Sequence, residues 1–462
     1  MSTARAIEAI AQRATAWTEK WMPDAFVFAL AATFIVCAAA YAIDPEVRRA
    51  PLRLVDAWGN GFWMLIPFTL QMVMIIIGGY VLASSPPVYR LIGRLAALPK
   101  TPKAAVLLVA LAAMLSSLVN WGFSLIFSAV LAREVARRVP GADYRALGAS
   151  SFLGLGTVWA QGLSGSAALQ MARASSMPPR LAQIVGEIPL TETIFRWQSL
   201  ACVATEIGVV AMAMWICAPG EGRGRTARSL GVDLGSGEVA RPAKPATPGE
   251  RLEHSPVLLL PIALAGLVYL IRVASRASSA SEALNTLDFN NVNLLFLMLG
   301  ALLHWTPASL MRSMKEATPA TWGVLLQFPF YAGIFGVMTA TQLSERMAGV
   351  FVRASSTTLY PAMILIYSSV LGMFVPSGGA KWMIEAPYVL QSAQALHVSQ
   401  GWMVIAYNLG EAIANLLQPF WMLPILALLG LKARDIMGYT YLIAVVLLPV
   451  ALVLITVLRP SP

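Results

Sequence analysis

Long apolar segments follow one another along almost the whole chain, separated by short polar gaps. The segments fall at about 23–43, 57–84, 104–131, 147–170, 198–218, 256–274, 291–305, 319–340, 359–396, 402–430 and 436–458. A helix needs roughly 20 consecutive apolar residues to cross a bilayer, and most of these segments are that long. The pattern therefore predicts an all-α polytopic membrane protein.

The segment at 359–396 is broken in its middle, where residues 374–382 read FVPSGGAKW. Pro376 removes a backbone donor, and the two glycines that follow disfavour helix. Neither flank is long enough to span alone, and a broken backbone at membrane depth needs cover from protein or from a water-filled cavity. The segment is therefore predicted to be a re-entrant hairpin, two half-helices that meet at a tip inside the membrane. The alternative is a surface loop between two short helices that dip into the membrane.

A second copy of this design lies in the first half of the chain. Gln71 and Gln327 occupy similar apolar contexts 256 positions apart. The same offset carries the hairpin tip onto 118–123, which reads LVNWGF within another apolar segment. It also aligns the segment 402–430 with a stretch that has its own polar break at 161–166. Three features that share one offset favour an internal repeat, with interrupted helices beside the hairpins.

Basic residues set the topology. Lys and Arg cluster on both sides of the 104–131 segment, so a spanning helix there would place one cluster outside, against the positive-inside rule. With two hairpins, about nine full spans and a cytoplasmic N-terminus, the inside loops hold nearly twice as many Lys and Arg as the outside loops. The second repeat then begins five crossings after the first. Inverted repeats with broken helices are typical of secondary transporters that bind substrate near the midplane.

This topology divides the chain into four parts. They are an N-terminal amphipathic surface helix at 1–21, a first repeat at 22–218 with the hairpin 104–131, a cytoplasmic linker at 219–255, and a second half at 256–462, in which an extra span precedes the inverted repeat with the hairpin 359–396. A frayed tail is the alternative for the first 21 residues.

Composition agrees with a membrane protein and excludes other classes. Residues are 58% hydrophobic and 12% charged, where soluble domains have about 25% charged residues. The net charge of +10 comes with no basic stripe and interleaved aromatics, so nucleic acid is not an expected partner. The three cysteines lie in apolar segments and indicate neither a disulfide framework nor a metal cluster. The sequence has no P-loop, so an ion gradient is the expected energy source.

Nine stretches, in order along nearly the whole chain, resemble the short-chain fatty acid transporter family, typified by bacterial acetoacetate and butyrate carriers. They are WGNGFW (58–63), NWGF (120–123), AREVARRVPGADY (132–144), GLSGSAAL (162–169), VNLLFLMLGALLH (292–304), LQFPFYAGI (326–334), VPSGGAKW (375–382), QPFWMLP (418–424) and RDIMGY (434–439). The family is similar in plan to the wider ion-transporter superfamily, whose members are typically dimers with a scaffold domain and an elevator-like transport domain. The resemblance implies a cation-coupled symporter of small monocarboxylates, without an organic cofactor, working as a homodimer in a bacterial-type inner membrane.

Two stretches depart from the family pattern. Ala380 stands where the hairpin usually has its third glycine, and Lys381 comes directly before Trp382. Residues 407–415, in the second interrupted helix, read YNLGEAIAN and are expanded and altered. Both departures lie where a cation or substrate should bind, so they bear on coupling and substrate choice more than on the fold.

The two hairpin tips form the candidate substrate site. The N-terminal ends of half-helices are positive and carry free N–H groups that suit a carboxylate, and nearby tryptophans can set the length of acyl chain that fits. The candidate residues are Ser117, Asn120, Trp121 and Gly122 at the first tip and Ser377, Gly378, Gly379, Lys381 and Trp382 at the second. The alternative is helix packing through small polar residues, which is common in membranes.

The polar breaks supply oxygen ligands that suit a hard coupling cation such as Na⁺. The candidate ligands are Asn120, Ser164, Gly165, Ser166, Ser377, Glu411 and Asn415. Residues 162–165 read GLSG and are also similar to the G-x-S-G motif of rhomboid-type intramembrane proteases, but such an enzyme needs a histidine base beside the serine. All three histidines lie at segment ends or in loops, so a transporter rather than an enzyme is predicted.

Lys381 is open to two interpretations. Glu385, one helical turn further on, can neutralise it. Alternatively, Lys381 is a fixed positive charge that attracts the substrate carboxylate or stands in for a coupling cation. For the chain as a whole, a carrier of small monocarboxylates such as acetoacetate or butyrate is predicted. A dicarboxylate or hydroxyacid carrier is the alternative within transport, and a passive anion channel is an alternative outside carriers.

Overall fold

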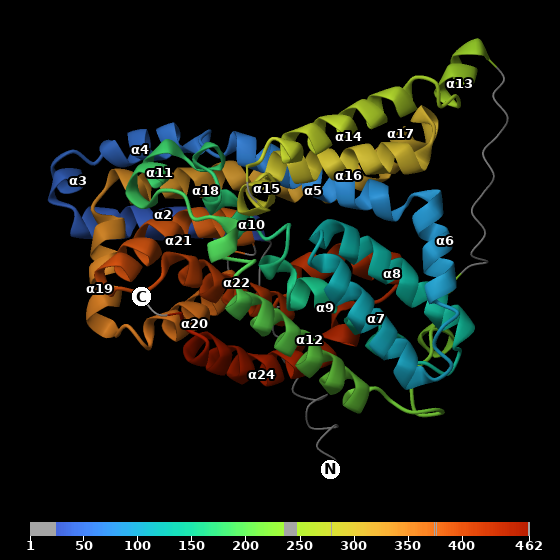
Figure 1. Ribbon diagram of the computed structural model, residues 1–462. Coiled ribbons are helices and arrows are strands. Elements are labelled where there is room, and N and C mark those ends of the chain that lie inside the picture. The colour runs from blue at the N-terminus through green and yellow to red at the C-terminus, as the bar shows by residue number, and fades with distance from the viewer. Residues whose placement is uncertain (1–24, 235–246, 279, 374, 376, 461–462) are drawn as a thin grey trace.

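The computed structural model describes residues 25–234, 247–278, 280–373, 375 and 377–460, and every regular element in those ranges is a helix (Figure 1). The predicted all-α class is therefore confirmed. The expected surface helix at 1–21 lies outside the described residues, as do Phe374 and Pro376 of the second hairpin tip.

The first predicted hairpin is a helix, a short break and a second helix that returns alongside the first. Its helices are α7 (Pro102–Ser117) and α8 (Trp121–Arg138). The Asn120 side chain caps α8 by accepting a hydrogen bond from the Phe123 N–H at 2.8 Å, which fixes where the helix starts. Across the hairpin, the Ser124 hydroxyl donates to the Ala113 carbonyl oxygen at 2.7 Å. The two helices therefore lie antiparallel and in direct contact.

The second hairpin has the same plan. Its helices are α20 (Tyr360–Gly372) and α21 (Gly378–Ala395). The Ser377 hydroxyl caps α21 by accepting a hydrogen bond from the Ala380 N–H at 3.3 Å. The Tyr360 hydroxyl at the start of α20 donates to the Val389 carbonyl oxygen near the end of α21 at 2.8 Å, so these helices are antiparallel as well.

Two helices are interrupted as predicted. The first consists of α9 (Tyr144–Gly156), the 3-10 turn η1 (Trp159–Gln161) and α10 (Ser166–Met171), and the second of α22 (Gln400–Leu417), the 3-10 turn η6 (Phe420–Met422) and α23 (Leu423–Leu429). The second bends by 71° at its break. That break falls at Gln418, so the altered stretch 407–415 is continuous helix. Gln418 is extended because it precedes Pro419, which disfavours helical backbone in the residue before it.

Four of the described helices are long and apolar enough to cross a membrane. They are α5 (Ile66–Ala83), α12 (Trp197–Cys217), α18 (Trp322–Ala340) and α24 (Ala433–Val457), and the second interrupted helix is a fifth if its bent halves form one span. The predicted segment 57–84 is two helices, because α4 (Arg53–Phe62) ends before α5 begins. Pro67 lies at the start of α5, where its missing N–H suits a first helical turn and not a continuing helix.

The remaining helices surround these elements. Apolar ones are α2 (Ala25–Ile43), α14 (Leu259–Ser275) and α16 (Phe289–His304); shorter or more polar ones are α3 (Pro45–Arg49), α6 (Pro86–Leu95), α11 (Pro179–Val185), α13 (Pro248–Glu253), α15 (Ala280–Asn285), α17 (Pro307–Ala317) and α19 (Leu343–Ala354); the other 3-10 turns are η2 (Ala174–Ser176), η3 (Leu190–Glu192), η4 (Arg228–Leu230) and η5 (Thr318–Ala320). In Figure 1, α14, α16 and α17 form an arm that projects from the rest. The described start of the predicted linker packs on the body, since the Tyr144 N–H donates to the Arg225 carbonyl oxygen at 2.8 Å.

Burial separates the broken helices from the arm. Nearly every residue of α9, α21 and α22 is buried, whereas Ala263 is the buried residue of α14. The exposed side of α14 is apolar and includes Ile262, Val268 and Ile271. Backbone that leaves the helical conformation is thus covered by protein, which is the condition for a broken helix in a membrane.

Candidate functional site

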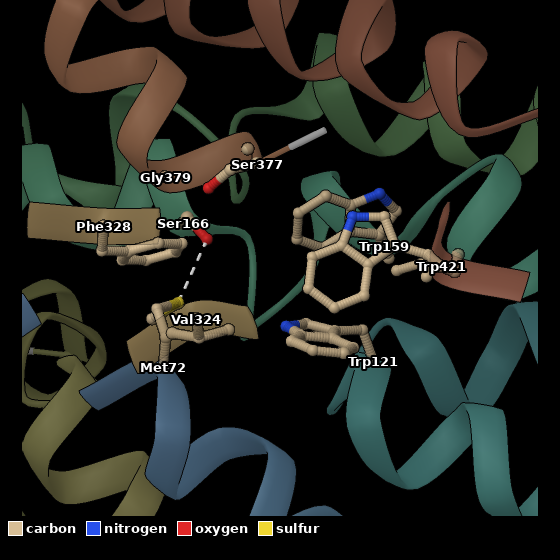
Figure 2. Close-up of a pocket in the computed structure, with 11 residues that line it drawn as sticks. Met72, Trp121, Trp159, Ser166, Val324, Phe328, Ser377, Gly379 and Trp421 are labelled. Atoms are coloured by element: carbon tan, nitrogen blue, oxygen red, sulfur yellow. Dashed lines mark hydrogen bonds between the residues drawn. The ribbon is translucent and has the colours of Figure 1, made fainter. Parts of the chain in front are cut away.

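Both tips and both interrupted helices meet at one small cavity (Figure 2). Its lining residues come from α5, α8, α9, η1, α10, α18, α21 and η6. They are Met72, Trp121, Leu155, Trp159, Ser166, Val324, Phe328, Ser377, Gly378, Gly379 and Trp421. A concave, mostly apolar cavity with a few polar groups is the usual form of a small-molecule site.

Three tryptophans form one wall of the cavity. The ring of Trp121 lies 6.2 Å from that of Trp159 and 5.2 Å from that of Trp421, measured between centroids, and both pairs are edge to face. Figure 2 shows these indoles gathered on one side, with Phe328, Met72 and Val324 on the other side of the space. The buried indole N–H of Trp159 has no hydrogen-bond partner among the described residues. The wall is therefore apolar, and the Trp159 N–H is a spare donor in it.

The second hairpin tip supplies the polar wall. Ser377 and Gly378 lie where α21 begins, and Ser166 lies beside them at the start of α10, with its hydroxyl directed at the Met72 sulfur at 3.7 Å (Figure 2). The N-terminus of the 18-residue α21 concentrates positive potential there. A Cβ at Gly379 would overlap the Phe68 ring, so glycine lets the tip approach α5 closely. This end of the cavity suits an anion.

The first tip is bound to the first interruption. The Trp121 N–H donates to the Ser164 hydroxyl at 2.9 Å, and the Leu163 N–H donates to the Leu118 carbonyl oxygen at 2.7 Å. Ser164 therefore satisfies the start of α8 and does not line the cavity. The Ser117 hydroxyl is used within its own helix, where it donates to the Met114 carbonyl oxygen at 2.8 Å.

The predicted substrate residues therefore separate into two groups. The cavity lining includes Trp121, Ser377, Gly378 and Gly379, and leaves out Ser117, Asn120, Gly122, Lys381 and Trp382. The last of these packs behind the tip, with its ring centroid 4.6 Å from that of Tyr407. Trp159, Phe328 and Met72 were not candidates, because an apolar side chain carries no sign in the sequence that it faces a cavity.

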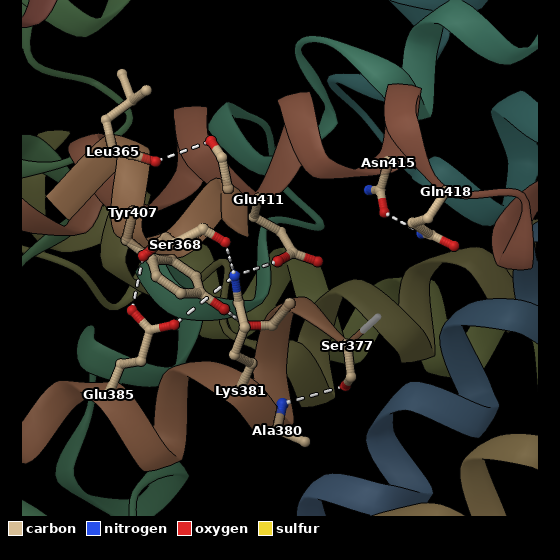
Figure 3. A network of polar contacts seen from close by, with 12 residues as sticks. Leu365, Ser368, Ser377, Ala380, Lys381, Glu385, Tyr407, Glu411, Asn415 and Gln418 are labelled. Carbon is tan, nitrogen blue, oxygen red and sulfur yellow. Dashed lines mark hydrogen bonds and ion pairs between the residues drawn. The ribbon is translucent and has the colours of Figure 1, made fainter. Parts of the chain in front are cut away.

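Lys381 lies in a buried ionic cluster beside the cavity (Figure 3). Its Nζ is 2.7 Å from a Glu411 oxygen and 3.7 Å from a Glu385 oxygen. Nζ also donates to the Ser368 carbonyl oxygen at 2.6 Å, and the Ser368 hydroxyl donates to Glu385 at 2.6 Å. Both interpretations of Lys381 thus have a basis, but the partner at hydrogen-bonding distance is Glu411 rather than Glu385.

Asn415 connects the two interrupted helices. Its side-chain N–H donates to the Leu155 carbonyl oxygen at 3.3 Å, and its oxygen accepts from the Gln418 amide at 3.0 Å. The Gln418 oxygen in turn accepts from the Phe420 N–H at 2.7 Å, so side chains satisfy the backbone at this break.

Glu206 is a further buried carboxylate at the other break, where it accepts hydrogen bonds from the Gln161 amide at 3.0 and 3.1 Å. The sequence marks Glu206 only as a single charge within an apolar segment.

No group of three or more His, Cys, Asp or Glu that could hold a metal ion occurs in the part of the chain that the structure describes. The three cysteines are free thiols. A hard monovalent cation would instead draw on hydroxyl, amide and carbonyl oxygens near the breaks and on single carboxylates such as Glu411.

Comparisons with solved structures place the fold among membrane transporters. Two structures match with TM-scores of 0.57 and 0.60, at 17% and 14% identity. The first is the YdaH transporter of Alcanivorax borkumensis, matched over 95% of this chain and 100% of that one. The second is MtrF of Neisseria gonorrhoeae, from a class of antimetabolite efflux pumps, matched over 96% of this chain and 97% of that one. At these identities the likeness shows the fold alone.

The sequence itself identifies the family. The profile of the short-chain fatty acid transporters matches residues 6–459. A relative from Escherichia coli (strain K12) is 38% identical over 92% of this chain and 94% of its own, and one from Haemophilus influenzae (strain ATCC 51907 / DSM 11121 / KW20 / Rd) is 33% identical over 94% and 96%. Both relatives carry names that assign them to short-chain fatty acid transport. The chain belongs to the short-chain fatty acid transporter family, so it is a membrane transporter and not an enzyme.

Proposed function

We propose that the chain is a secondary active transporter of short-chain monocarboxylates, such as acetoacetate or butyrate, and that the cavity between the tips is its substrate site. The observation that carries the proposal is that one small cavity is lined by both hairpins and both interrupted helices. Broken helices that converge on one point are the usual construction of a transporter binding site.

The two walls of the cavity match the two ends of a short fatty acid. The carboxylate binds at the start of α21, where backbone N–H groups and the Ser166 and Ser377 hydroxyls are at hand. The acyl chain lies against Trp121, Trp159 and Trp421. None of the lining residues is Lys or Arg, so no cationic side chain is available in the cavity for a second carboxylate. This favours a monocarboxylate over the dicarboxylate alternative.

An inverted repeat and an elevator movement belong to the same proposal. Adding 256 to the bounds of α5, α7, α8 and α10 brings each within two residues of the bounds of α18, α20, α21 and α23 respectively. This agreement supports two copies of one unit, with the hairpins as re-entrant elements in the membrane. The proposal also includes an inner-membrane location with a cytoplasmic N-terminus, an orientation that the charge bias supports. Coupling to Na⁺ or H⁺ and a homodimeric assembly are included on the basis of the family resemblance.

The test is uptake of radiolabelled butyrate and acetoacetate into proteoliposomes, under an imposed Na⁺ gradient or an imposed pH gradient. We expect saturable accumulation, corrected for the free acid that crosses empty liposomes. Accumulation no greater than in empty liposomes for both acids would overturn the proposal. Conductance without saturation or ion coupling would instead indicate a channel.

A variant of the tryptophan wall tests the site itself. Trp159→Ala enlarges the cavity, so we expect the preference among straight-chain acids to move from butyrate toward hexanoate. The matched control is Trp197→Ala, because Trp197 is 65% exposed and lies away from the cavity lining. An unchanged chain-length preference in folded Trp159→Ala would place the substrate elsewhere.

A further inference from the structure

The ionic cluster around Lys381 has the form of an occupied cation site. The ammonium of Lys381 is fully buried and meets a carbonyl oxygen of Ser368 and carboxylate oxygens of Glu411 and Glu385, at 2.6, 2.7 and 3.7 Å. The face of the Tyr407 ring lies 4.8 Å from Nζ. Oxygen ligands and an aromatic face are what a small monovalent cation finds favourable in a protein.

The charges around Lys381 do not balance. One ammonium faces two carboxylates, and one Glu411 oxygen is buried without a hydrogen-bond partner. The hydroxyls near the carboxylates are engaged, since the Ser368 hydroxyl donates to Glu385 at 2.6 Å and Tyr367 and Tyr388 bond to each other at 2.9 Å. The carboxylates therefore require a cation at the position that the ammonium occupies, because unpaired buried charge is strongly unfavourable.

The cluster also touches the substrate cavity. The Tyr407 hydroxyl donates to the carbonyl oxygen of Gly378, a residue of the cavity lining. A side chain added at Gly378 would lie 3.3 Å from the Glu411 side chain on its other side. Whatever fills the cluster can thus affect the position of the second hairpin tip.

We propose that the space between α20, α21 and α22 is a monovalent-cation site and that the ammonium of Lys381 is its permanently tethered occupant. The carrier then needs no mobile Na⁺ at this position, which restricts ion coupling to sites elsewhere in the chain. This consequence for coupling rests on the proposed transport function, whereas the site itself does not.

The experiment is to remove the tether and offer free cations. The full chain carrying Lys381→Ala is melted in N-methyl-D-glucamine chloride and, at the same ionic strength, in sodium, potassium, ammonium or methylammonium chloride. We expect one or more of the small cations to raise the melting temperature by about 3 °C or more above any rise in the wild type. Lys381→Met is the matched control, because its side chain refills the space without a charge and should respond like the wild type.

The outcomes separate the site from the transport function. A cation response in Lys381→Ala no larger than in the wild type and in Lys381→Met would overturn the assignment. If Lys381→Ala does not fold, Lys381→Ala with Glu385→Gln leaves one unpaired carboxylate and decides the question by the same melts. In proteoliposomes, butyrate uptake by the alanine variant should gain a requirement for a small cation. If the wild type takes up no butyrate, the proposed function fails while the melts still decide the site.

Discussion

The two hairpins share a geometry but differ in chemistry. In the first, the Ser124 hydroxyl donates across to the Ala113 carbonyl oxygen at 2.7 Å; in the second, the Lys381 ammonium donates to the Ser368 carbonyl oxygen at 2.6 Å. Adding 256 to the residue numbers of Ser124 and Ala113 gives 380 and 369, each one position from Lys381 and Ser368. The antiparallel register is thus the same, although one contact is neutral and the other ionic.

The three charged residues of the cluster have apolar counterparts in the first half of the chain. The positions 256 residues before Lys381, Glu385 and Glu411 are held by leucine at 125, alanine at 129 and leucine at 155. All three of these apolar residues are buried. A hairpin of this design therefore folds with apolar residues at these three positions, so the cluster in the second half is not required by the architecture.

The interruptions differ in a similar way. At the first, Gly162 packs its backbone against Leu118, and a Cβ there would lie 2.5 Å from the Leu118 Cα. At the second, the equivalent position is Gln418, whose side chain binds Asn415 and the Phe420 N–H. One break is held by close backbone approach and the other by side-chain hydrogen bonds.

The largest effect should come from making the second hairpin like the first. Lys381→Leu leaves Glu385 and Glu411 buried without their cation, so we expect a loss of about 3–5 kcal/mol in unfolding free energy. Adding Glu385→Ala and Glu411→Leu copies the first half, and should restore most of that stability. The measurement is denaturant unfolding of purified protein in detergent micelles.

The control for this series is Leu125→Met in the first hairpin, a volume-conserving change at the counterpart position that should cost less than about 1.5 kcal/mol. Equal stability of the single leucine variant and the wild type would show that the carboxylates are not charged in the fold. A triple variant as unstable as the single one would show that the cluster is essential to the second hairpin.

The next effect concerns the two breaks. Gly162→Ala places a methyl group against backbone that cannot move aside as a side chain would, so we expect a loss of about 1–3 kcal/mol and at least about tenfold weaker butyrate uptake. Gln418→Ala removes hydrogen bonds but creates no clash, and should cost about 1–2 kcal/mol. Thermal melts and uptake of both variants are the measurements. A larger loss of stability and uptake in Gln418→Ala than in Gly162→Ala would contradict this difference between the breaks.

The sequence predicted the broken elements well because their signals are local. Pro376, Gly378 and Asn120 act on the backbone next to them, so the hairpin positions follow from propensity and capping. The offset of 256 carries the first break at 161–166 onto 417–422, where the second helix breaks at Gln418, but the altered stretch 407–415 gave no sign of its own conformation. In the structure these residues are helical, and their polarity serves contacts with other helices.

The composition of the site was less predictable, because it depends on which side chains converge from distant elements. Lys381 was assigned to the tip by proximity in sequence, but one helical turn carries its ammonium away from the cavity lining and toward Glu411, 30 positions later. Trp159 and Phe328 had no polar signal at all. Tertiary packing, which periodicity does not encode, decides both cases.

A smaller effect should distinguish the helix caps at the two tips. Asn120→Ala removes the acceptor of a 2.8 Å bond from the Phe123 N–H, whereas Ser377→Ala removes the acceptor of a 3.3 Å bond from the Ala380 N–H. We expect Asn120→Ala to lower the free energy of unfolding by about 1 kcal/mol and Ser377→Ala to lower it by less, because the shorter hydrogen bond is the stronger cap. Thermal melts of the two variants, with Ser116→Ala as a control on the same hairpin, measure the difference. A larger loss at Ser377 would reverse this ranking.

The smallest effect is expected at Glu206, the carboxylate beside the otherwise neutral first break. In Glu206→Gln, the new amide oxygen still accepts from Gln161, and the new N–H can donate to the Gln161 oxygen, which has no hydrogen-bond partner now. The free energy of unfolding should therefore change by less than about 1 kcal/mol, whereas Glu206→Leu strands the Gln161 amide and should cost about 1–3 kcal/mol. If charge chemistry belongs to the second half alone, butyrate uptake by Glu206→Gln keeps the ion dependence of the wild type. Folded Glu206→Gln protein that has lost gradient-driven uptake would instead assign ion coupling to the first break, and would reverse the contrast between the halves.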